Sequence, residues 1–245
     1  MSYILILGAA SDIAKAVAAE YAKQGKSLYL ATRAQEKEEA EATATDLKVK
    51  YNIEAETVEV DAVDFASHAD FYEKLDPKPE GTLLFIGYLG DQIKAQADFE
   101  ETQRIINTNY VGAVSLLNVI ANDYESKKSG FIVGVSSVAG DRGRQSNYLY
   151  GSAKAGLTAY LSGLRHRLYA SGVHVVTVKP GFVNTRMTEG MDLPAKLTAE
   201  PEEVARDIVK AQQKRKNTIY TKWFWRCVMM VITSIPEFVF KKTKL

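Results

Sequence analysis

Residues 134–156 read GVSSVAGDRGRQSNYLYGSAKAG and form the most informative stretch of the chain. Tyr150 and Lys154 are four residues apart in a segment with helical spacing, so their side chains share one helix face. Ser137 follows the apolar run Phe131–Val135, which predicts a strand. We therefore expect the Ser137 hydroxyl at the carboxyl end of a strand, where open α/β sheets bind their ligands.

These three side chains suit a narrow range of chemistry. A free tyrosine has a pKa near ~10 and is a weak acid and a weak base at neutral pH. A neighbouring ammonium, here Lys154, favours the phenolate and lowers that pKa. A serine hydroxyl can hydrogen-bond a carbonyl oxygen as negative charge develops on it. The set predicts reduction of a ketone or oxidation of an alcohol; the alternative is a solvated Tyr–Lys pair on a helix face.

Ser137, Tyr150 and Lys154 resemble the catalytic residues of the short-chain dehydrogenase/reductase superfamily. The resemblance implies an NAD(P)-dependent oxidoreductase acting on CH–OH groups. It also implies an α/β fold: a single Rossmann-type, doubly wound parallel sheet with helices on both faces. No linker, repeat or low-complexity tract divides the 245 residues, so we predict one domain over 1–222 with an amphipathic extension over 223–245.

The composition excludes several other classes. The chain has 31 basic and 30 acidic residues, which gives no electrostatic case for nucleic acid. Cys227 is the only cysteine, so an intramolecular disulfide is impossible and a reducing compartment fits. The N-terminus lacks a basic segment before its apolar run, and we expect a cytoplasmic protein. The three histidines share no ligand spacing, so we expect no metal.

The N-terminal segment predicts a strand, a tight loop and a helix, which together aim backbone N–H groups at a phosphate. Its loop, GAASDIA, starts at Gly8 and resembles the superfamily pattern Gly-x-x-x-Gly-x-Gly, with Asp12 and Ala14 in place of the later glycines. We expect Asp12 to cap the helix. Ser11 and the amides of residues 11–13, Ile13 included, would then face the cofactor; the alternative is an ordinary βα turn.

The segment after the second predicted strand, residues 27–31, indicates which cofactor binds. NAD-users commonly have an acidic residue there, whereas this chain has Thr32 and Arg33 and no acid before Glu36. A guanidinium suits the additional phosphate of NADP. We predict NADPH/NADP as the preferred cofactor, with NADH/NAD as the alternative if Arg33 is simply solvated.

Further segments resemble the superfamily in the expected order. Asp61 and Ala62, after a third strand, would border the adenine. Gly87 opens Gly-Tyr-Leu-Gly, where the superfamily has Asn-Asn-Ala-Gly, so the missing asparagine contacts must come from elsewhere. Asn109, inside a helix predicted over 99–124, would kink that helix and hold a water behind the lysine; the alternative is a polar residue on an exposed turn.

The segment after the sixth predicted strand completes the resemblance. Pro180-Gly181-Phe182-Val183-Asn184-Thr185 is similar to the superfamily's Pro-Gly-x-Val-x-Thr. There the valine backbone contacts the nicotinamide carboxamide and the threonine reaches a phosphate. Tyr150 and Lys154 would also border the cofactor, Lys154 at the nicotinamide ribose.

Two segments bear on the substrate. The loop 141–147 carries Arg142 and Arg144, which suit a phosphorylated substrate, and Asn147; the alternative is a surface loop paired with Asp141. The tail 223–240 is broadly apolar, but its longest uninterrupted run is too short to span a bilayer. It predicts an interfacial segment or a lid; a core or dimer-interface helix is the alternative.

A closer resemblance is carried by residues 88–91, 150–157 and 185–187 and by the tail residues 228–231 and 235–236. These segments resemble the decaprenylphosphoryl-2-keto-erythro-pentose reductases. That resemblance implies reduction of a polyprenyl-phosphate 2-ketopentose, a cell wall precursor, made by a flavoprotein oxidase partner. It implies a homo-oligomer, dimer or tetramer, with peripheral contact at the inner face of the membrane, and Tyr88 near the substrate. The alternatives are a reductase of another hydrophobic or acyl-chain ketone, and a non-catalytic NADP-binding sensor.

Overall fold

The computed structural model describes residues 2–243, so Met1 of the predicted domain and residues 244–245 of the predicted extension lie outside it. Seven parallel strands form one sheet in the order β3-β2-β1-β4-β5-β6-β9. A second, two-stranded sheet pairs β7 with β8. The strands are β1 (Tyr3–Leu7), β2 (Ser27–Thr32), β3 (Ala55–Glu59), β4 (Gly81–Leu84), β5 (Phe131–Val135), β6 (His174–Pro180), β7 (Phe182–Val183), β8 (Thr198–Ala199) and β9 (Thr218–Thr221).

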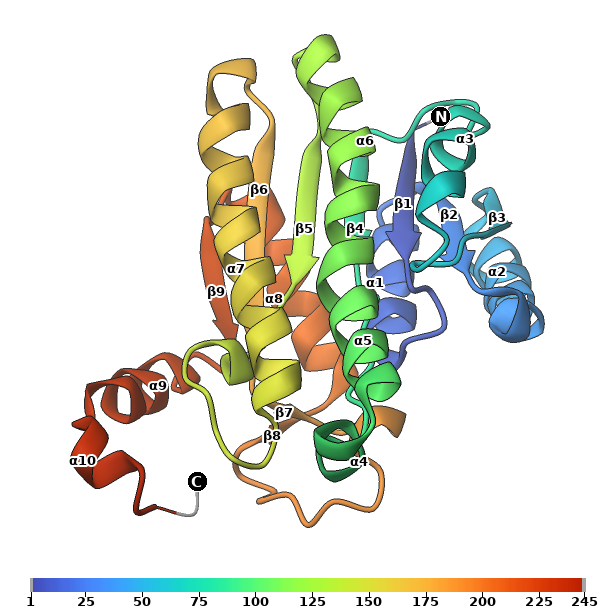
Figure 1. Cartoon of the computed structure of the whole chain (residues 1–245). Coiled ribbons are helices and arrows are strands. Elements are labelled where there is room, and N and C mark those ends of the chain that lie inside the picture. The colour runs from blue at the N-terminus through green and yellow to red at the C-terminus, as the bar shows by residue number, and fades with distance from the viewer. Residues whose placement is uncertain (1, 244–245) are drawn as a thin grey trace.

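Helices cover both faces of the large sheet, which confirms the predicted Rossmann-type architecture (Figure 1). Successive residues of β1 point to opposite faces, and all five are buried, as expected for a strand covered on both sides. The helices are α1 (Asp12–Ala22), α2 (Lys37–Tyr51), α3 (His68–Glu73), α4 (Gln92–Ala97), α5 (Phe99–Ile106), α6 (Gly112–Lys127), α7 (Tyr148–Leu168), α8 (Pro201–Gln213), α9 (Trp225–Ser234) and α10 (Glu237–Phe240).

Two hydrophobic clusters divide along the sheet. Ile4 and Ile6 of β1 pack with residues of α1, α2 and α8 on one face. Leu5 and Leu7 pack with residues of α3, α6 and α7 on the other. The alternating side chains of one apolar strand therefore belong to two separate cores, and together these cores fix the register of the sheet.

The carboxyl ends of the parallel strands meet at one edge of the sheet, at the lower end in Figure 1. The strand order reverses between β1 and β4, which is the position where doubly wound folds bind their ligands. The loops that start at Gly8, Phe85 and Ser136 all leave this edge. The candidate residues of these three separate chain segments are therefore brought together there.

The helix predicted over 99–124 is interrupted. α5 and α6 are joined by a π-helical turn, Asn107–Val111, which contains the buried Asn109. Asn109 donates from Nδ2 to the Ile105 carbonyl at 2.8 Å and so bonds within the widened turn. A π-helical turn inside a helix is frequent at functional sites.

The tail leaves the carboxyl end of β9 and forms α9 and α10, which stand beside the body of the protein in Figure 1. Ile235 and Pro236 separate the two helices, so the apolar stripe is not one continuous helix. Trp225 and Met229 of α9 are buried against Val138, while Trp223, Met230 and Phe238 are 63 to 77% exposed. No helix within residues 2–243 has the length and apolar character needed to cross a bilayer.

Candidate active site

Ser137 and Tyr150 lie at the contact between the turn after β5 and the first turn of α7. Two glycines allow this approach: a Cβ at Gly140 would lie 2.7 Å from the Ala155 nitrogen, and one at Gly151 would lie 2.7 Å from the Ala139 oxygen. Any side chain there would push the turn away from the helix. These glycines therefore determine how close the Ser137 and Tyr150 side chains come.

The Tyr150 phenol is protonated at neutral pH. Burial raises its pKa to about 12, and a hydrogen bond with the Ser137 side chain opposes that shift. The Ser137 Oγ atom accepts from the Ala139 N–H at 3.1 Å, which leaves the serine proton for donation, either to Tyr150 or to a carbonyl oxygen. A protonated phenol and a free hydroxyl are the donors that the oxygen of a carbonyl undergoing reduction requires.

Lys154 is 3% exposed and lies on the same face of α7 as Tyr150. Its Nζ atom is 5.6 Å from the centroid of the Tyr150 ring and donates to the Val135 carbonyl at 3.2 Å. Burial lowers the pKa of Lys154 to about 8. The expected lowering of the Tyr150 pKa by this ammonium is therefore not seen, because burial dominates both groups.

The side chains of Asn109 and Lys154 both lie close to Gly87, in the loop that follows β4. A Cβ at Gly87 would lie 3.4 Å from Asn109 Oδ1 and 3.5 Å from Lys154 Nζ. The Asn109 amide also binds both backbone groups of Tyr88, accepting from N at 3.1 Å and donating to O at 2.6 Å. Asn109 is thus buried rather than on an exposed turn, and it holds the loop that follows β4.

Glu101 also holds the loop that follows β4, a role that the sequence pattern did not indicate. Its buried carboxylate accepts from the Tyr88 hydroxyl at 2.8 Å and from the Asp91 N–H at 3.1 Å. Together with Asn109 it supplies the contacts that the absent asparagines were expected to make. Tyr88 is therefore oriented by α5. The sequence gives little indication that Glu101 is buried, because an acidic residue in a charged first turn of a helix usually faces solvent.

The loop after β1 has the shape of a phosphate cradle. Gly8 has φ +82°, and a Cβ there would lie 2.8 Å from the Ile86 nitrogen, so only glycine lets the two loops touch. The loop runs into the first turn of α1, at residues 12–14, where N–H groups have no acceptor within the helix. Ser11 is the N-cap residue and Ile13 lies in the first turn. These residues fit a bound pyrophosphate.

The prediction that Asp12 caps α1 is wrong. Its carboxylate instead accepts from the Arg186 backbone N–H at 2.9 Å and from Arg186 Nε at 3.2 Å. Arg186 also pairs with Glu39 and binds the Ala10 carbonyl. A cationic partner has drawn the Asp12 side chain away from the helix axis, and the guanidinium offsets the carboxylate's repulsion of a phosphate.

Arg33 lies at the end of β2 and is half-exposed, with its guanidinium paired to Glu36. Glu36 also accepts from the Thr32 hydroxyl at 3.0 Å, which steadies the pair. Asp61 accepts from the Val63 N–H at 3.0 Å. Ala62 packs so closely on α6 that a Cβ at Gly112 would lie 2.1 Å from its carbonyl oxygen. Arg33 is thus held by an ion pair rather than simply solvated.

The segment Pro180–Thr185 crosses the same edge. Val183 is buried, and its carbonyl accepts from the Thr188 hydroxyl at 2.7 Å. Thr185 is the N-cap of the next short turn and contacts the Thr188 hydroxyl at 3.5 Å. Gly181 faces the tail: a Cβ there would lie 2.0 Å from the Trp225 ring. The glycine thus makes room for the tail, a role that the local pattern did not indicate.

The two loop arginines have different surroundings. Arg142 donates to the carbonyls of Ile232 and Ile235 at 2.7 and 2.6 Å and pairs with Glu237 at 3.0 Å. It therefore caps the carboxyl end of α9, and its prediction as a substrate contact is corrected to a tail contact. Arg144 has no such set of acceptors within residues 2–243.

Asp141 does not pair with either arginine, so that alternative is also wrong. Its carboxylate accepts from Lys179 at 2.5 Å and from the Tyr220 hydroxyl at 2.8 Å. Asn147, the N-cap residue of α7, makes no side-chain cap bond. The Asp141 contacts anchor the start of the loop to β6 and β9.

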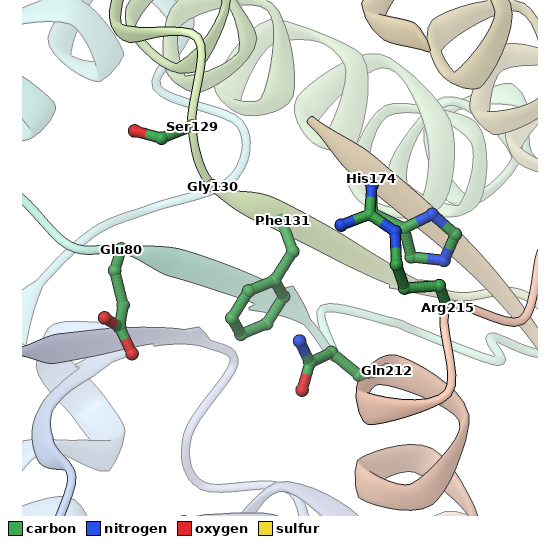
Figure 2. Close-up of a pocket in the computed structure, with 7 residues that line it drawn as sticks. All are labelled: Glu80, Ser129, Gly130, Phe131, His174, Gln212 and Arg215. Carbon is green, nitrogen blue, oxygen red and sulfur yellow. The ribbon is translucent and has the colours of Figure 1, made fainter. Parts of the chain in front are cut away.

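A separate shallow cavity lies between Glu80, Phe131, His174 and Arg215 (Figure 2). These residues stand at or near the amino ends of β4, β5 and β6 and after α8. The cavity is therefore at the opposite edge of the sheet from Tyr150. Ligands of open α/β sheets bind at the carboxyl edge, so we place the active site there.

The chain belongs to the short chain dehydrogenase family, whose family model matches residues 2–194. It is 38% identical over 242 residues to an uncharacterized oxidoreductase of Mycobacterium tuberculosis, covering 98% of this chain and 96% of the relative. An uncharacterized oxidoreductase of Streptomyces coelicolor is 34% identical over 98% of this chain and 94% of its own length. Family members are oxidoreductases, and NAD(P) use is typical of them.

A solved structure supports the fold independently. A short-chain dehydrogenase from Sphingobium yanoikuyae, in complex with NADPH, superposes with a TM-score of 0.82 at 22% identity over 97% of each chain. Because it covers 97% of the chain, this likeness extends beyond residue 194, where the match to the family model ends. The two proteins thus share the same overall fold.

Proposed function

We propose that this protein is an NADPH-dependent ketoreductase whose substrate is a polyprenyl-phosphate-linked 2-ketopentose. The observation that carries the proposal is the protonated Tyr150 phenol, bonded to Ser137 and beside Lys154. Val138, which follows Ser137 in the chain, packs on Trp225 and Met229 of the apolar tail, and Arg144 reaches Met229. A sugar ketone, an anionic phosphate and an apolar chain are the three substrate parts that these groups suit.

The residues of the site divide the work of reduction. NADPH, when bound, supplies the hydride. Tyr150 donates the proton to the carbonyl oxygen, and Ser137 orients that oxygen and stabilises its charge. Lys154 holds the nicotinamide ribose and restores the proton of Tyr150. Asn109 holds the Tyr88 loop against the site and, by family resemblance, a water that links Lys154 to solvent.

Several segments around the carboxyl edge suit the rest of the cofactor. The first turn of α1, with Ser11 and Ile13, suits the pyrophosphate. Arg33 suits the 2′-phosphate of NADP. Binding that phosphate would weaken the ion pair between Arg33 and Glu36. By the family resemblance, Asp61 and Ala62 would border the adenine, and the segment Pro180–Thr185 would border the nicotinamide. Gly87 leaves the space between Asn109 and Lys154 open.

Steady-state rates across a substrate panel test the proposal. We expect kcat/KM for a polyprenyl-phosphate 2-ketopentose, prepared with a flavoprotein oxidase, to exceed that for acyl-chain ketones by at least about a hundredfold. The same assays with NADH are expected to be slower. A preference for simple apolar ketones would instead support the second candidate, a reductase of another hydrophobic ketone. The apolar cluster of Val138, Trp225 and Met229 favours that candidate.

The tail also suggests where the enzyme works. Exposed apolar side chains on α9 and α10 stand with the exposed cations Arg226, Lys241 and Lys242, a combination typical of interfacial helices. We propose peripheral contact with the inner face of the membrane in the cytoplasm, in a homo-oligomer that receives its substrate from a flavoprotein oxidase.

Vesicle co-sedimentation checks the membrane contact. We expect the full chain to bind vesicles that contain anionic lipid. The double variant M230S/F238S is expected to bind at least about tenfold more weakly, since two exposed apolar groups are lost. Both side chains are exposed, so the fold and NADPH affinity should be unaffected. Equal sedimentation of the variant would contradict the contact.

A further inference from the structure

The guanidinium of Arg144 lacks a full set of hydrogen-bond acceptors among the described residues. Its Nε atom is buried without a hydrogen-bond partner, and its Nη2 atom has only the Met229 thioether, at 3.9 Å. A thioether is a weak acceptor. Burial lowers the pKa of Arg144; Asp141 opposes that shift, but its carboxylate already binds Lys179 and Tyr220. Holding a partly buried guanidinium without acceptors destabilises the folded protein. An anionic ligand bound to it would offset this loss of stability.

Two further side-chain polar atoms, on segments joined to the start of α7, are buried and unpaired within residues 2–243: Gln92 Nε2 and Asn147 Oδ1. Gln92 is fixed to the start of α7, because its Oε1 atom accepts from the Leu149 N–H at 3.1 Å. Asn147 is fixed to Arg144, whose carbonyl accepts from the Asn147 N–H at 3.1 Å. All three residues therefore border the helical turn that carries Tyr150.

The unpaired atoms consist of two donors and one acceptor. Anionic oxygens satisfy donors such as those of Arg144 and Gln92, whereas the Asn147 carbonyl needs a hydroxyl or another donor. A phosphorylated sugar offers both kinds of group. The apolar cluster around Met229 lies directly beside the guanidinium and suits an attached hydrocarbon chain.

We propose that Arg144, Gln92 and Asn147 form the subsite for the sugar phosphate of the substrate, with α9 as the wall for its apolar chain. The inference rests on the proposed function and makes it specific. It gives the two loop arginines separate tasks. Arg142 fastens the tail through the carbonyls at the end of α9, and Arg144 receives the phosphate.

Ligand titrations followed by tryptophan fluorescence test the subsite without turnover. Both tryptophans, Trp223 and Trp225, lie in the tail, and Trp225 shares a cluster with Met229. We expect the full chain to bind farnesyl phosphate at least about tenfold more tightly than farnesol. Arg144→Gln is expected to lose this preference, and Arg144→Lys to keep part of it. Arg206→Gln, which removes an exposed arginine of α8 outside the tail, should leave the preference unchanged.

Several results would overturn the subsite. One is Arg144→Gln retaining the full preference while binding NADPH like the wild type. If that variant fails to bind NADPH, Gln92→Leu is tested in its place. We expect Gln92→Leu to bind farnesyl phosphate about fivefold more weakly and to bind farnesol as the wild type does. Ribose 5-phosphate, which lacks the chain, is expected to compete at least about tenfold more weakly than farnesyl phosphate. Equal competition would contradict the apolar half of the subsite.

Binding and turnover separate the two proposals. A phosphate preference that depends on Arg144, with no reduction of the lipid-linked ketone, would support the subsite and overturn the proposed reaction. Reduction of that ketone with an unchanged KM in Arg144→Gln would overturn the subsite and support the reaction.

Discussion

Replacing Tyr150 by phenylalanine is expected to lower kcat for ketone reduction by about a thousandfold while leaving the Kd for NADPH within about twofold. The phenol is the proton donor in our proposal, and its pKa of about 12 keeps it protonated across the neutral range. Phenylalanine preserves the aromatic ring at this position of α7 but has no hydroxyl proton to donate. Stopped-flow measurement of NADPH oxidation, together with a fluorescence titration of NADPH, checks both numbers.

Tyr148→Phe is the matched control, because Tyr148 lies on the same turn and is 41% exposed. It should retain at least about half of the wild-type kcat, since surface substitutions of this kind usually have small effects. A Tyr150→Phe variant with near-normal turnover would remove Tyr150 from the proposed mechanism. Equal losses in both variants would point to a change in α7 itself.

Replacing Lys154 by methionine is expected to abolish turnover and to stabilise the cofactor-free protein. Burial lowers the Lys154 pKa from 10.5 to about 8, a difference that corresponds to roughly 3 kcal/mol. The lost hydrogen bond to Val135 offsets about 1 kcal/mol of this gain. A net increase of about 2 kcal/mol in the free energy of unfolding at pH 7 should appear in urea titrations.

The sign of the pH dependence makes this prediction specific. The folded state favours the neutral lysine, so the cost of burying the charge is fully present below pH 8 and is relieved as the pH rises toward 10.5. The stability difference between Lys154→Met and the wild type should therefore shrink across this interval. A difference that stays constant from pH 7 to about pH 10 would show that burial of the charge is not its cause.

Much of the architecture could be predicted, because its signals are local. Buried parallel strands read as short apolar runs, and the spacing of Ser137, Tyr150 and Lys154 is a property of one strand and one helix. Asn109 could be indicated by the resemblance to the superfamily, because the residues that carry this resemblance lie within a few positions of one another. The sheet order then brings these segments to one edge.

The errors concern side chains whose partners lie far away in the sequence. Asp12 looked like a helix cap, but its partner Arg186 comes 174 positions later. Arg142 looked like a phosphate ligand, yet the carbonyls it binds belong to the tail, 90 and 93 positions later. A pattern within one helix or loop cannot identify such partners, because the tertiary fold determines which distant groups lie close to a given side chain.

Transfer of deuterium from 4-deuterated NADPH to a polyprenyl-phosphate 2-ketopentose, followed by mass spectrometry of the released sugar, tests the central claim most directly. We predict label at carbon 2 of the pentose product, formed by the wild type and Tyr148→Phe but not by Tyr150→Phe. Unlabelled sugar, or label incorporated equally by Tyr150→Phe, would contradict hydride transfer at the site formed by Ser137, Tyr150 and Lys154.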